Sequence, residues 1–238
     1  LPYFSIENGS FSCTLEPNAP VYGLGEQVRG INKRGWIYVS NCTDEPHHEE
    51  TRRSLYGAHN FLIVGGKTPF GIFLDYPGHL TFDIGYTDRN VLTITPEDWN
   101  LDVYLIESPD GLCSSIVHLF RRMIGRSYIP PRWAFGYGQS RWGYMDEKDI
   151  RQVARGYRGD GIPLDAIYLD IDYMERYKDF TVSGERFPDL PGLVSDMKKE
   201  GIHLVPIIDA GVKIEEGYSV YEEGVKNNYF CKEADGTD

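Results

Sequence analysis

The first half of the chain alternates apolar and polar residues in short segments. Residues 80–84 alternate Leu, Phe and Ile with Thr and Asp, and residues 101–105 repeat this alternation with Leu and Val. Further short apolar segments stand at residues 21–24, 60–64 and 70–74. Many short segments of period two, separated by Gly and Pro, are typical of an antiparallel β-sandwich. We therefore predict a sandwich for this part of the chain.

The pattern changes to a helical one after residue 107. Six apolar residues lie on one helical face after the opening Ser108-Pro109-Asp110, namely Leu112, Ile116, Leu119, Phe120, Met123 and Ile124. Ile129-Pro130-Pro131 then favours an extended backbone. We expect the helix to link two domains, a sandwich domain over residues 1–126 and a second domain over residues 127–238.

The second half alternates strand and helix patterns. Apolar segments at 133–137, 164–174 and 203–208 read as strands, and helical periodicity fills the two intervals between them. Asp146 and Asp189 are placed to cap the two helices, and Gly201 is placed to end the second. Near-continuous apolar strands joined by helices predict a parallel sheet with right-handed crossovers.

The length of this second half limits the fold. Only 105 residues follow Trp133, whereas a closed eight-stranded α/β barrel needs about 250. We therefore expect the first three strand–helix units of an incomplete (β/α)8 barrel, from a larger protein cut before closure. An open doubly wound sheet is the alternative, although it usually needs more strands.

Polar side chains follow the ends of the predicted strands. Asp170 and Asp172 end the second strand at positions i and i+2, and Asp209 follows the third. Alternate side chains of a strand point the same way, so the first two would face one pocket if the strand extends that far. Trp142 lies just beyond the first strand. The C-terminal ends of barrel strands carry the functional groups.

Composition excludes several partners. The net charge is −12, with 24 basic and 36 acidic residues, so we expect no nucleic acid and no anionic membrane as partner. No apolar run reaches the ~18 residues of a membrane span, and no signal peptide is visible. Four scattered cysteines without metal-ligand spacing predict reduced thiols in a cytoplasmic protein, at Cys13, Cys42, Cys113 and Cys231.

Eight short motifs together resemble glycoside hydrolase family 31, the α-glucosidases and their relatives, most closely the bacterial ones. In order they are residues 22–26 (YGLGE), 55–59 (LYGAH), 130–133 (PPRW), 139–144 (QSRWGY), 162–165 (IPLD), 169–174 (LDIDYM), 178–181 (KDFT) and 186–188 (RFP). Each motif alone is weak, but their shared order and spacing are specific and cover nearly the whole chain.

The resemblance implies a retaining hydrolase of α-glycosidic bonds that uses two aspartates and needs no metal or organic cofactor. The family places its nucleophile on the fourth barrel strand in a Trp-x-Asp-Met-Asn-type motif, and its acid/base later. Neither motif is present here, so we expect no catalytic residue in this chain and no activity from the chain alone. The expected partners are an oligosaccharide substrate and the remainder of the barrel.

The resemblance also assigns substrate-binding residues. Asp170 is implied to hold hydroxyls of the terminal sugar, and Trp142 to line the same subsite. Ile171 and Ile207 are expected as apolar walls, with plain core packing about equally favoured. Asp209 is undecided between subsite and scaffold, and we favour a structural role for Asp172.

Trp142 stands where many relatives carry Tyr, which predicts a preference for isomaltose over maltose. Two other functions stay open. One is a non-catalytic carbohydrate-binding or scaffold protein, and the other is a related α-galactosidase or α-xylosidase. The sequence leaves the oligomeric state and the biological substrate undetermined.

Overall fold

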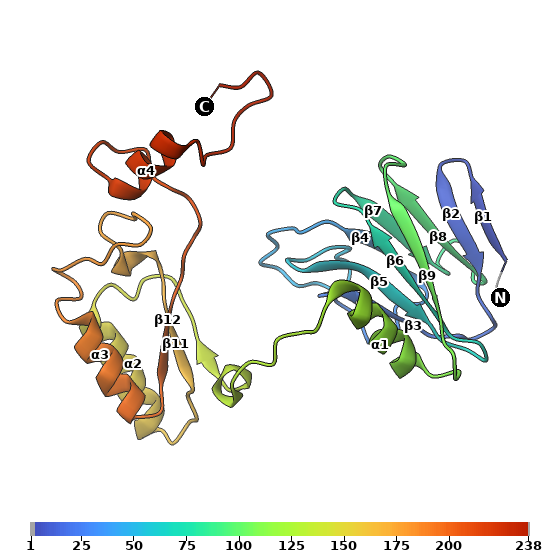
Figure 1. Ribbon diagram of the computed structural model, residues 1–238. Coiled ribbons are helices and arrows are strands. Elements are labelled where there is room, and N and C mark those ends of the chain that lie inside the picture. Colours follow the sequence, from blue (N-terminus) through green and yellow to red (C-terminus); the bar gives the residue numbers. More distant parts are fainter. Residues whose placement is uncertain (1–2, 238) are drawn as a thin grey trace. The chain divides into compact units, whose positions relative to one another are not determined.

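The alternating segments of the first half form two antiparallel sheets (Figure 1). The computed structural model describes residues 3–237, which divide into two units between Ser127 and Tyr128. One sheet has the order β1 (Phe4–Glu7), β2 (Ser10–Thr14), β8 (Val91–Pro96), β7 (Leu80–Ile84) and β4 (Trp36–Ser40). The other has the order β3 (Val21–Gly25), β5 (Ala58–Val64), β6 (Phe70–Asp75) and β9 (Asp102–Glu107).

The core of this unit lies between the two sheets. Tyr38, Phe82 and Ile94 of the first sheet are fully buried and belong to one cluster with Leu62 and Ile72 of the second. These residues occupy alternate positions of their strands, which is why the period-two pattern predicted the sandwich. The prediction of a sandwich is confirmed, and strands β1, β2, β4 and β8 add to the five segments expected.

Helix α1 (Cys113–Ile124) covers the outer face of the four-stranded sheet (Figure 1). Its Phe120 ring stacks on Phe61 of β5, with centroids 3.9 Å apart and planes 6° apart. Ile116 is fully buried, and a Cβ added to Gly71 would lie 2.6 Å from its side chain. Gly71 therefore lets the helix approach the sheet closely.

The second unit contains a parallel sheet of order β10 (Gly138–Gln139), β11 (Ala166–Leu169) and β12 (His203–Pro206). The prediction of a first strand at 133–137 was wrong. Residues Arg132–Phe135 form a 3₁₀ turn, η1, and the strand begins at Gly138. The Trp133 ring stacks on His203 of β12, a residue distant in sequence, with centroids 4.1 Å apart.

Helices α2 (Glu147–Gly159) and α3 (Leu190–Lys199) pack on one face of this sheet (Figure 1). Ile167 and Leu169 of β11 are buried in one cluster with residues of both helices. Asp146 accepts hydrogen bonds from the amides of Lys148 and Asp149, and Asp189 accepts one from Gly192. Both predicted caps are confirmed, and the backbone turns left-handed at Gly201 after α3, where the end was expected.

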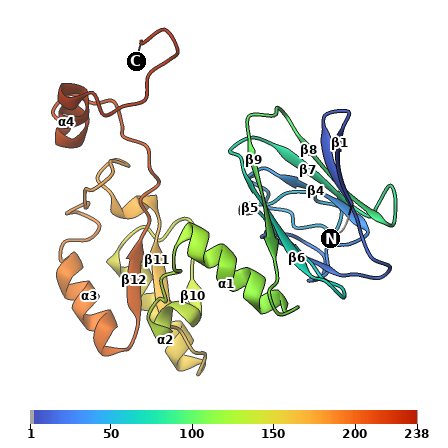
Figure 2. The ribbon, with the colours of Figure 1, turned by 45° about the vertical axis from the view of Figure 1, so that its right-hand side comes forward.

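The second strand is shorter than its apolar run suggests. β11 ends at Leu169, and residues Ile171–Tyr173 form a second 3₁₀ turn, η2. The connections that follow β11 and β12 leave the same end of the sheet, and the second leads into α4 (Ser219–Asn227), a helix that the sequence pattern did not indicate (Figure 2).

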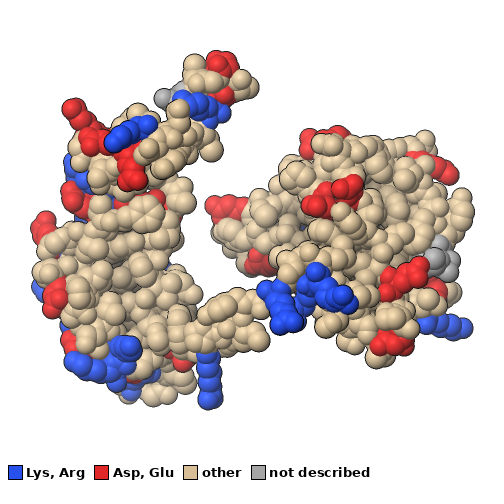
Figure 3. All heavy atoms as spheres, viewed as in Figure 1, with Lys and Arg blue, Asp and Glu red and all other residues tan. Residues whose placement is uncertain are grey.

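In the view of Figure 3, acidic side chains are spread over both units, and basic side chains gather in a compact group near the end of α1. This distribution agrees with the net charge of −12. Within residues 3–237, no helix combines the length and the apolar character that crossing a membrane requires.

Candidate active-site edge of the sheet

Parallel strands bring the predicted site residues to one edge of the sheet. Gln139, Ile167 and Leu204 are paired across β10, β11 and β12. Trp142, Asp170 and Ile207 each lie three residues after one of these paired positions. All three therefore leave the sheet at its C-terminal edge, which is the edge where α/β barrels hold their substrates. We name this edge, with its residues Trp142, Asp170, Ile171, Ile207 and Asp209, the candidate site.

Asp170 follows directly on β11 and is partly exposed. Its Oδ1 accepts a hydrogen bond of 2.7 Å from the amide of Ile171, which is the first residue of η2. No hydrogen bond to Oδ2 is found among the described residues. Asp170 thus caps the turn with one oxygen and leaves the other available for an external donor.

Asp172 has different surroundings. It is 1% exposed, and its Oδ1 receives a hydrogen bond of 3.4 Å from Arg186, whose Nη1 also donates to the Asp172 carbonyl at 3.2 Å. The expectation that Asp170 and Asp172 face one pocket depended on the strand continuing through both residues. Because β11 ends at Leu169, the alternation does not apply to them.

The apolar candidates lie next to Asp170. Ile171 is partly exposed and Ile207 is 38% exposed. The backbone amide of Ile207 donates to the carbonyl of Leu169, so the residue after β12 stays beside the end of β11. Asp209 is exposed and has a left-handed backbone with φ of 52°.

Trp142 stands apart from these contacts. Its side chain is 73% exposed, and its carbonyl accepts a hydrogen bond of 3.1 Å from the Arg141 side chain. The described contacts join Ile171 and Ile207 to the end of β11 beside Asp170. They do not join Trp142 to Asp170.

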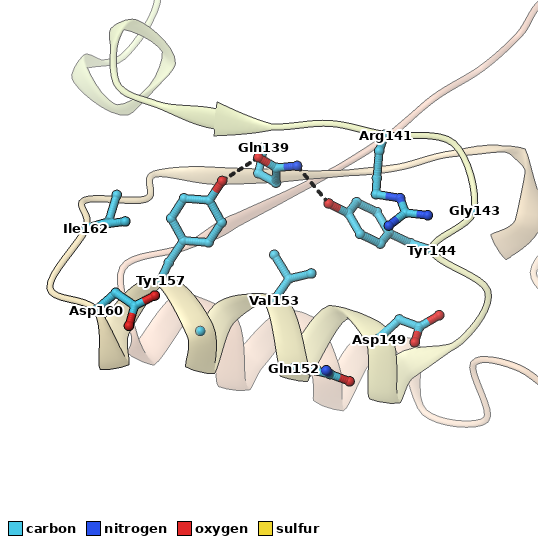
Figure 4. A pocket seen from close by; sticks show the side chains of 11 residues that line it. Gln139, Arg141, Gly143, Tyr144, Asp149, Gln152, Val153, Tyr157, Asp160 and Ile162 are labelled. Carbon is cyan, nitrogen blue, oxygen red and sulfur yellow. Dashed lines mark hydrogen bonds between the residues drawn. The ribbon is translucent and has the colours of Figure 1, made fainter.

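An open cavity of about 630 Å³ lies beside the candidate site, between the β10 exit and α2 (Figure 4). Gln139 is central to its hydrogen bonds: its Oε1 accepts from Tyr157 at 2.5 Å, and its Nε2 donates to Tyr144 at 3.0 Å. The hydrogen bond with Tyr137, together with desolvation, raises the pKa of Tyr157 to about 12. The Tyr157 phenol therefore stays neutral at ordinary pH. None of the candidate-site residues lines this cavity.

Sequence reasoning missed a group of buried polar residues beside the candidate site. Lys178 and Asp179 follow η2 and are 7% and 3% exposed. Their only sequence signal was the KDFT motif at 178–181, which carried no assigned role. Within residues 3–237, no group of three or more His, Cys, Asp and Glu side chains is placed to hold a metal ion.

Two family models cover most of the chain. The galactose mutarotase-like N-terminal domain of glycosyl hydrolase family 31 matches residues 4–83, and the TIM-barrel domain of the same family matches residues 127–238. The chain belongs to glycosyl hydrolase family 31. This family membership confirms the fold: a β-sandwich followed by the first three strand–helix units of a TIM-barrel domain.

Two of the relatives are named α-glucosidases. The chain is 38% identical over 218 residues to alpha-glucosidase 2 of Bacillus thermoamyloliquefaciens. The aligned region covers 90% of this chain and 27% of that protein. It is 27% identical over 221 residues to the alpha-glucosidase of Saccharolobus solfataricus, covering 92% of this chain and 31% of the relative. The chain therefore spans under a third of the length of these family 31 relatives.

Solved structures agree on the fold. A mutant of the family 31 dextranase of Flavobacterium johnsoniae, in complex with isomaltotriose, is 26% identical with a TM-score of 0.70, covering 85% of this chain and 25% of that chain. The alpha subunit of glucosidase II has a TM-score of 0.79 at 22% identity, covering 96% and 27%. At 22% identity, the similarity to the glucosidase II alpha subunit supports the fold alone.

Proposed function

We propose that this chain is part of a retaining α-glucosidase that releases terminal glucose from short oligosaccharides. The observation that carries the proposal is the position of Asp170, a partly exposed carboxylate at the C-terminal edge of β11 with one oxygen free of hydrogen bonds among the described residues. Relatives of this chain named as α-glucosidases support the choice of glucose as the terminal sugar.

Asp170 is proposed to bind the substrate rather than to react with it. A carboxylate accepts short, charge-assisted hydrogen bonds from sugar hydroxyls. A site built for such bonds discriminates strongly against a sugar whose hydroxyl is missing or inverted, because its polar groups are then left unpaired. By the family pattern the hydroxyl is that at C4 of the terminal sugar.

The other candidate residues shape the same subsite in this proposal. Ile171 and Ile207 flank Asp170 and form apolar walls, and Trp142 lines the mouth. Asp209 follows Ile207 closely enough to be either a sugar contact or a scaffold residue. Retention requires two carboxylates about 5–5.5 Å apart, and by the family pattern both belong to a later part of the complete enzyme. They supply the reaction, while this chain supplies the binding of the terminal sugar.

The linkage preference is a further part of the proposal. A mutant of the dextranase at 26% identity is complexed with isomaltotriose, and a sucrase-isomaltase of Oryctolagus cuniculus is 30% identical over 235 residues. These names, with the exposed indole of Trp142, support a preference of the complete enzyme for α-1,6-linked glucose.

The test is a panel of nitrophenyl α-glycosides assayed with the complete enzyme. Glucoside, galactoside and xyloside should be compared by kcat/KM, and the glucoside should be strongly preferred. A preference for the galactoside or the xyloside would instead identify the complete enzyme as an α-galactosidase or an α-xylosidase with the same site. Binding of oligosaccharide without turnover of any substrate would favour a carbohydrate-binding protein instead.

We also propose a cytoplasmic location, supported by four cysteines that form no disulfide among the described residues. Fractionation of the source cells, with detection of the complete enzyme by antibody, tests this. Recovery in the secreted or a membrane-enclosed fraction would overturn it.

A further inference from the structure

The segment that follows β12 is held at two points by the loop that follows β11. The Tyr173 hydroxyl donates a hydrogen bond of 2.8 Å to the carbonyl of Ile207. The Asp179 Oδ2 accepts one of 3.2 Å from the amide of Gly211. Between these two points lies Asp209, which has a left-handed backbone with φ of 52°. The two hydrogen bonds thus bracket Asp209.

Asp179 makes the second of these contacts from a buried position. It is 3% exposed, and its carbonyl accepts a hydrogen bond of 2.6 Å from the hydroxyl of Tyr218, just before α4. A buried carboxylate is costly unless it is hydrogen-bonded. Both polar ends of Asp179 therefore face the connection between β12 and α4.

Ionic contacts join the same two segments. Lys178, 7% exposed, lies 3.4 Å from Glu215 through its Nζ, and Arg176 also pairs with Glu215. The Lys178 ammonium lies 5.5 Å from the ring centroid of Tyr218. Residues 173–179 thus contact the following connection at four positions, namely Ile207, Gly211, Glu215 and Tyr218.

The loop itself is strained. Arg176, Tyr177 and Phe180 all have positive φ values, between 52° and 63°. Backbone of this kind persists only where surrounding contacts impose it. The ion pairs of Lys178 and the hydrogen bonds of Asp179 are among the contacts that this loop makes.

We propose that Asp179 is a positioning residue for the sugar subsite, acting through the Gly211 amide to fix the segment that carries Ile207 and Asp209. This inference rests on the proposed function, because it assumes that this segment forms a wall of the subsite. Asp179 itself touches backbone and not substrate. Its loss should let the wall move away from the bound sugar, and displacements of about 1 Å at such sites lower rates strongly.

Three variants of the complete enzyme test the proposal. Asp179→Ala removes the acceptor, and we expect kcat/KM for the preferred glycoside to fall about tenfold or more. Asp179→Asn keeps an oxygen that can accept from Gly211 and should retain activity within about threefold. Asp196→Ala is the control, because Asp196 lies on α3 and, among the described residues, pairs with Arg151 and Lys199.

Hydrogen exchange supplies a readout that does not depend on activity. Peptides covering 207–218 should exchange faster in Asp179→Ala than in the wild type or in Asp196→Ala. Assays should run well below the melting temperature of each variant. Unchanged kcat/KM in Asp179→Ala, with only a lower Tm, would overturn the proposal and leave a structural role. Equal losses in the Ala and Asn variants would overturn the hydrogen-bond mechanism.

Tyr218→Phe keeps the test decisive if Asp179→Ala does not fold. This variant removes one hydrogen bond to the Asp179 carbonyl and keeps the ring. We expect faster exchange at 207–218 and a smaller loss of kcat/KM, and no change in either would overturn the proposal. Failure of the proposed function is separately visible, because the wild-type enzyme would then prefer a different glycoside or none.

Discussion

Asp170 and Asp172 lie two residues apart, yet only Asp172 is neutralised by a partner. Arg186 Nη1 lies 3.4 Å from Asp172 Oδ1, and the Asp172 side chain is 2% exposed against 39% for the arginine. Among the described residues, the Asp170 carboxylate has no cation partner and accepts a hydrogen bond only from the Ile171 amide. The difference follows from the end of β11 at Leu169, after which the chain turns and sends Asp172 inward. Two carboxylates of the same motif therefore have different expected roles.

Asp170→Asn should lower catalysis while keeping the fold. The amide has the size of the carboxylate but lacks its charge, so two hydrogen bonds to sugar hydroxyls weaken together. We expect a loss of about 3–5 kcal/mol in transition-state binding. The measurement is kcat/KM of the complete enzyme for α-glucosides, with circular dichroism to check folding. Activity within a few-fold of the wild type would remove Asp170 from the subsite.

Arg186→Ala should destabilise the protein, because it leaves the buried Asp172 carboxylate without its cation. Breaking a buried pair costs about 3–5 kcal/mol, and the partial exposure of Arg186 reduces our expectation to about 2–3 kcal/mol. Denaturant unfolding of the complete enzyme, followed through the barrel domain, measures the change.

Arg151→Ala is the control for this variant. Arg151 pairs with Glu147 and Asp196 near the surface, and exposed pairs contribute about 0–1 kcal/mol. The double variant Arg186→Met with Asp172→Leu should recover part of the lost stability, because no unpaired charge remains buried. Equal effects of Arg186→Ala and Arg151→Ala would contradict the assignment.

The isolated 238-residue chain should not hydrolyse p-nitrophenyl α-glucoside. Losing a nucleophile costs several powers of ten in rate, and the family places the nucleophile outside the motifs found here. The isolated chain should also aggregate, because Tyr137, Tyr168 and Ile208 of the sheet region are 49%, 41% and 47% exposed. Clear turnover by the purified chain, with the complete enzyme as reference, would refute the first expectation.

Cys13 should resist alkylation at pH 8, whereas the exposed Cys42 and Cys231 should react. Burial raises the pKa of the Cys13 thiol from 9.0 to about 12. The unfolded chain therefore ionises this thiol first, so its contribution to stability is complete below pH 9 and is lost as the pH rises toward 12.

Mass spectrometry after iodoacetamide treatment would locate the modified cysteines, and a sample in denaturant is the positive control. Labelling of Cys13 as fast as Cys42 in the native protein would show that the sandwich core is open at β2.

Most of the fold could be predicted because burial follows the apolar pattern. Leu80, Phe82 and Ile84 of β7 are fully buried, and their alternation with polar residues is what the sequence displays. The first strand of the second unit could not be placed from local pattern. Trp133 is held by stacking on His203, a contact between residues seventy positions apart.

The candidate site was less predictable than the fold. The ends of parallel strands indicated Asp170 and Asp209 on topology alone, but the role of Asp170 came from the family resemblance. The buried Asp179 was missed because a charged residue in a loop ordinarily reads as solvated. It accepts hydrogen bonds from Gly211 and Tyr218, which come from another connection of the sheet.

Trp142→Tyr should shift the preference of the complete enzyme from isomaltose toward maltose. The indole is broader than a phenol and lacks the hydroxyl, so in the proposed position at the mouth of the subsite it would narrow the space beside the scissile oxygen. An α-1,6 linkage has an extra exocyclic carbon–carbon bond and can turn the second sugar away from this wall. An α-1,4 linkage holds the second ring closer and has less freedom to avoid it.

The discrimination between isomaltose and maltose would come from the shape of the pocket wall alone, and such discrimination is usually worth about 1–3 kcal/mol. The wild type should therefore favour isomaltose by a ratio of kcat/KM values rather than absolutely, and the variant should reduce that ratio. Trp99→Tyr is a matched control, because Trp99 is a partly exposed indole in the sandwich unit, 42% exposed. A ratio that moves equally in both variants, or in neither, would remove Trp142 from linkage selection.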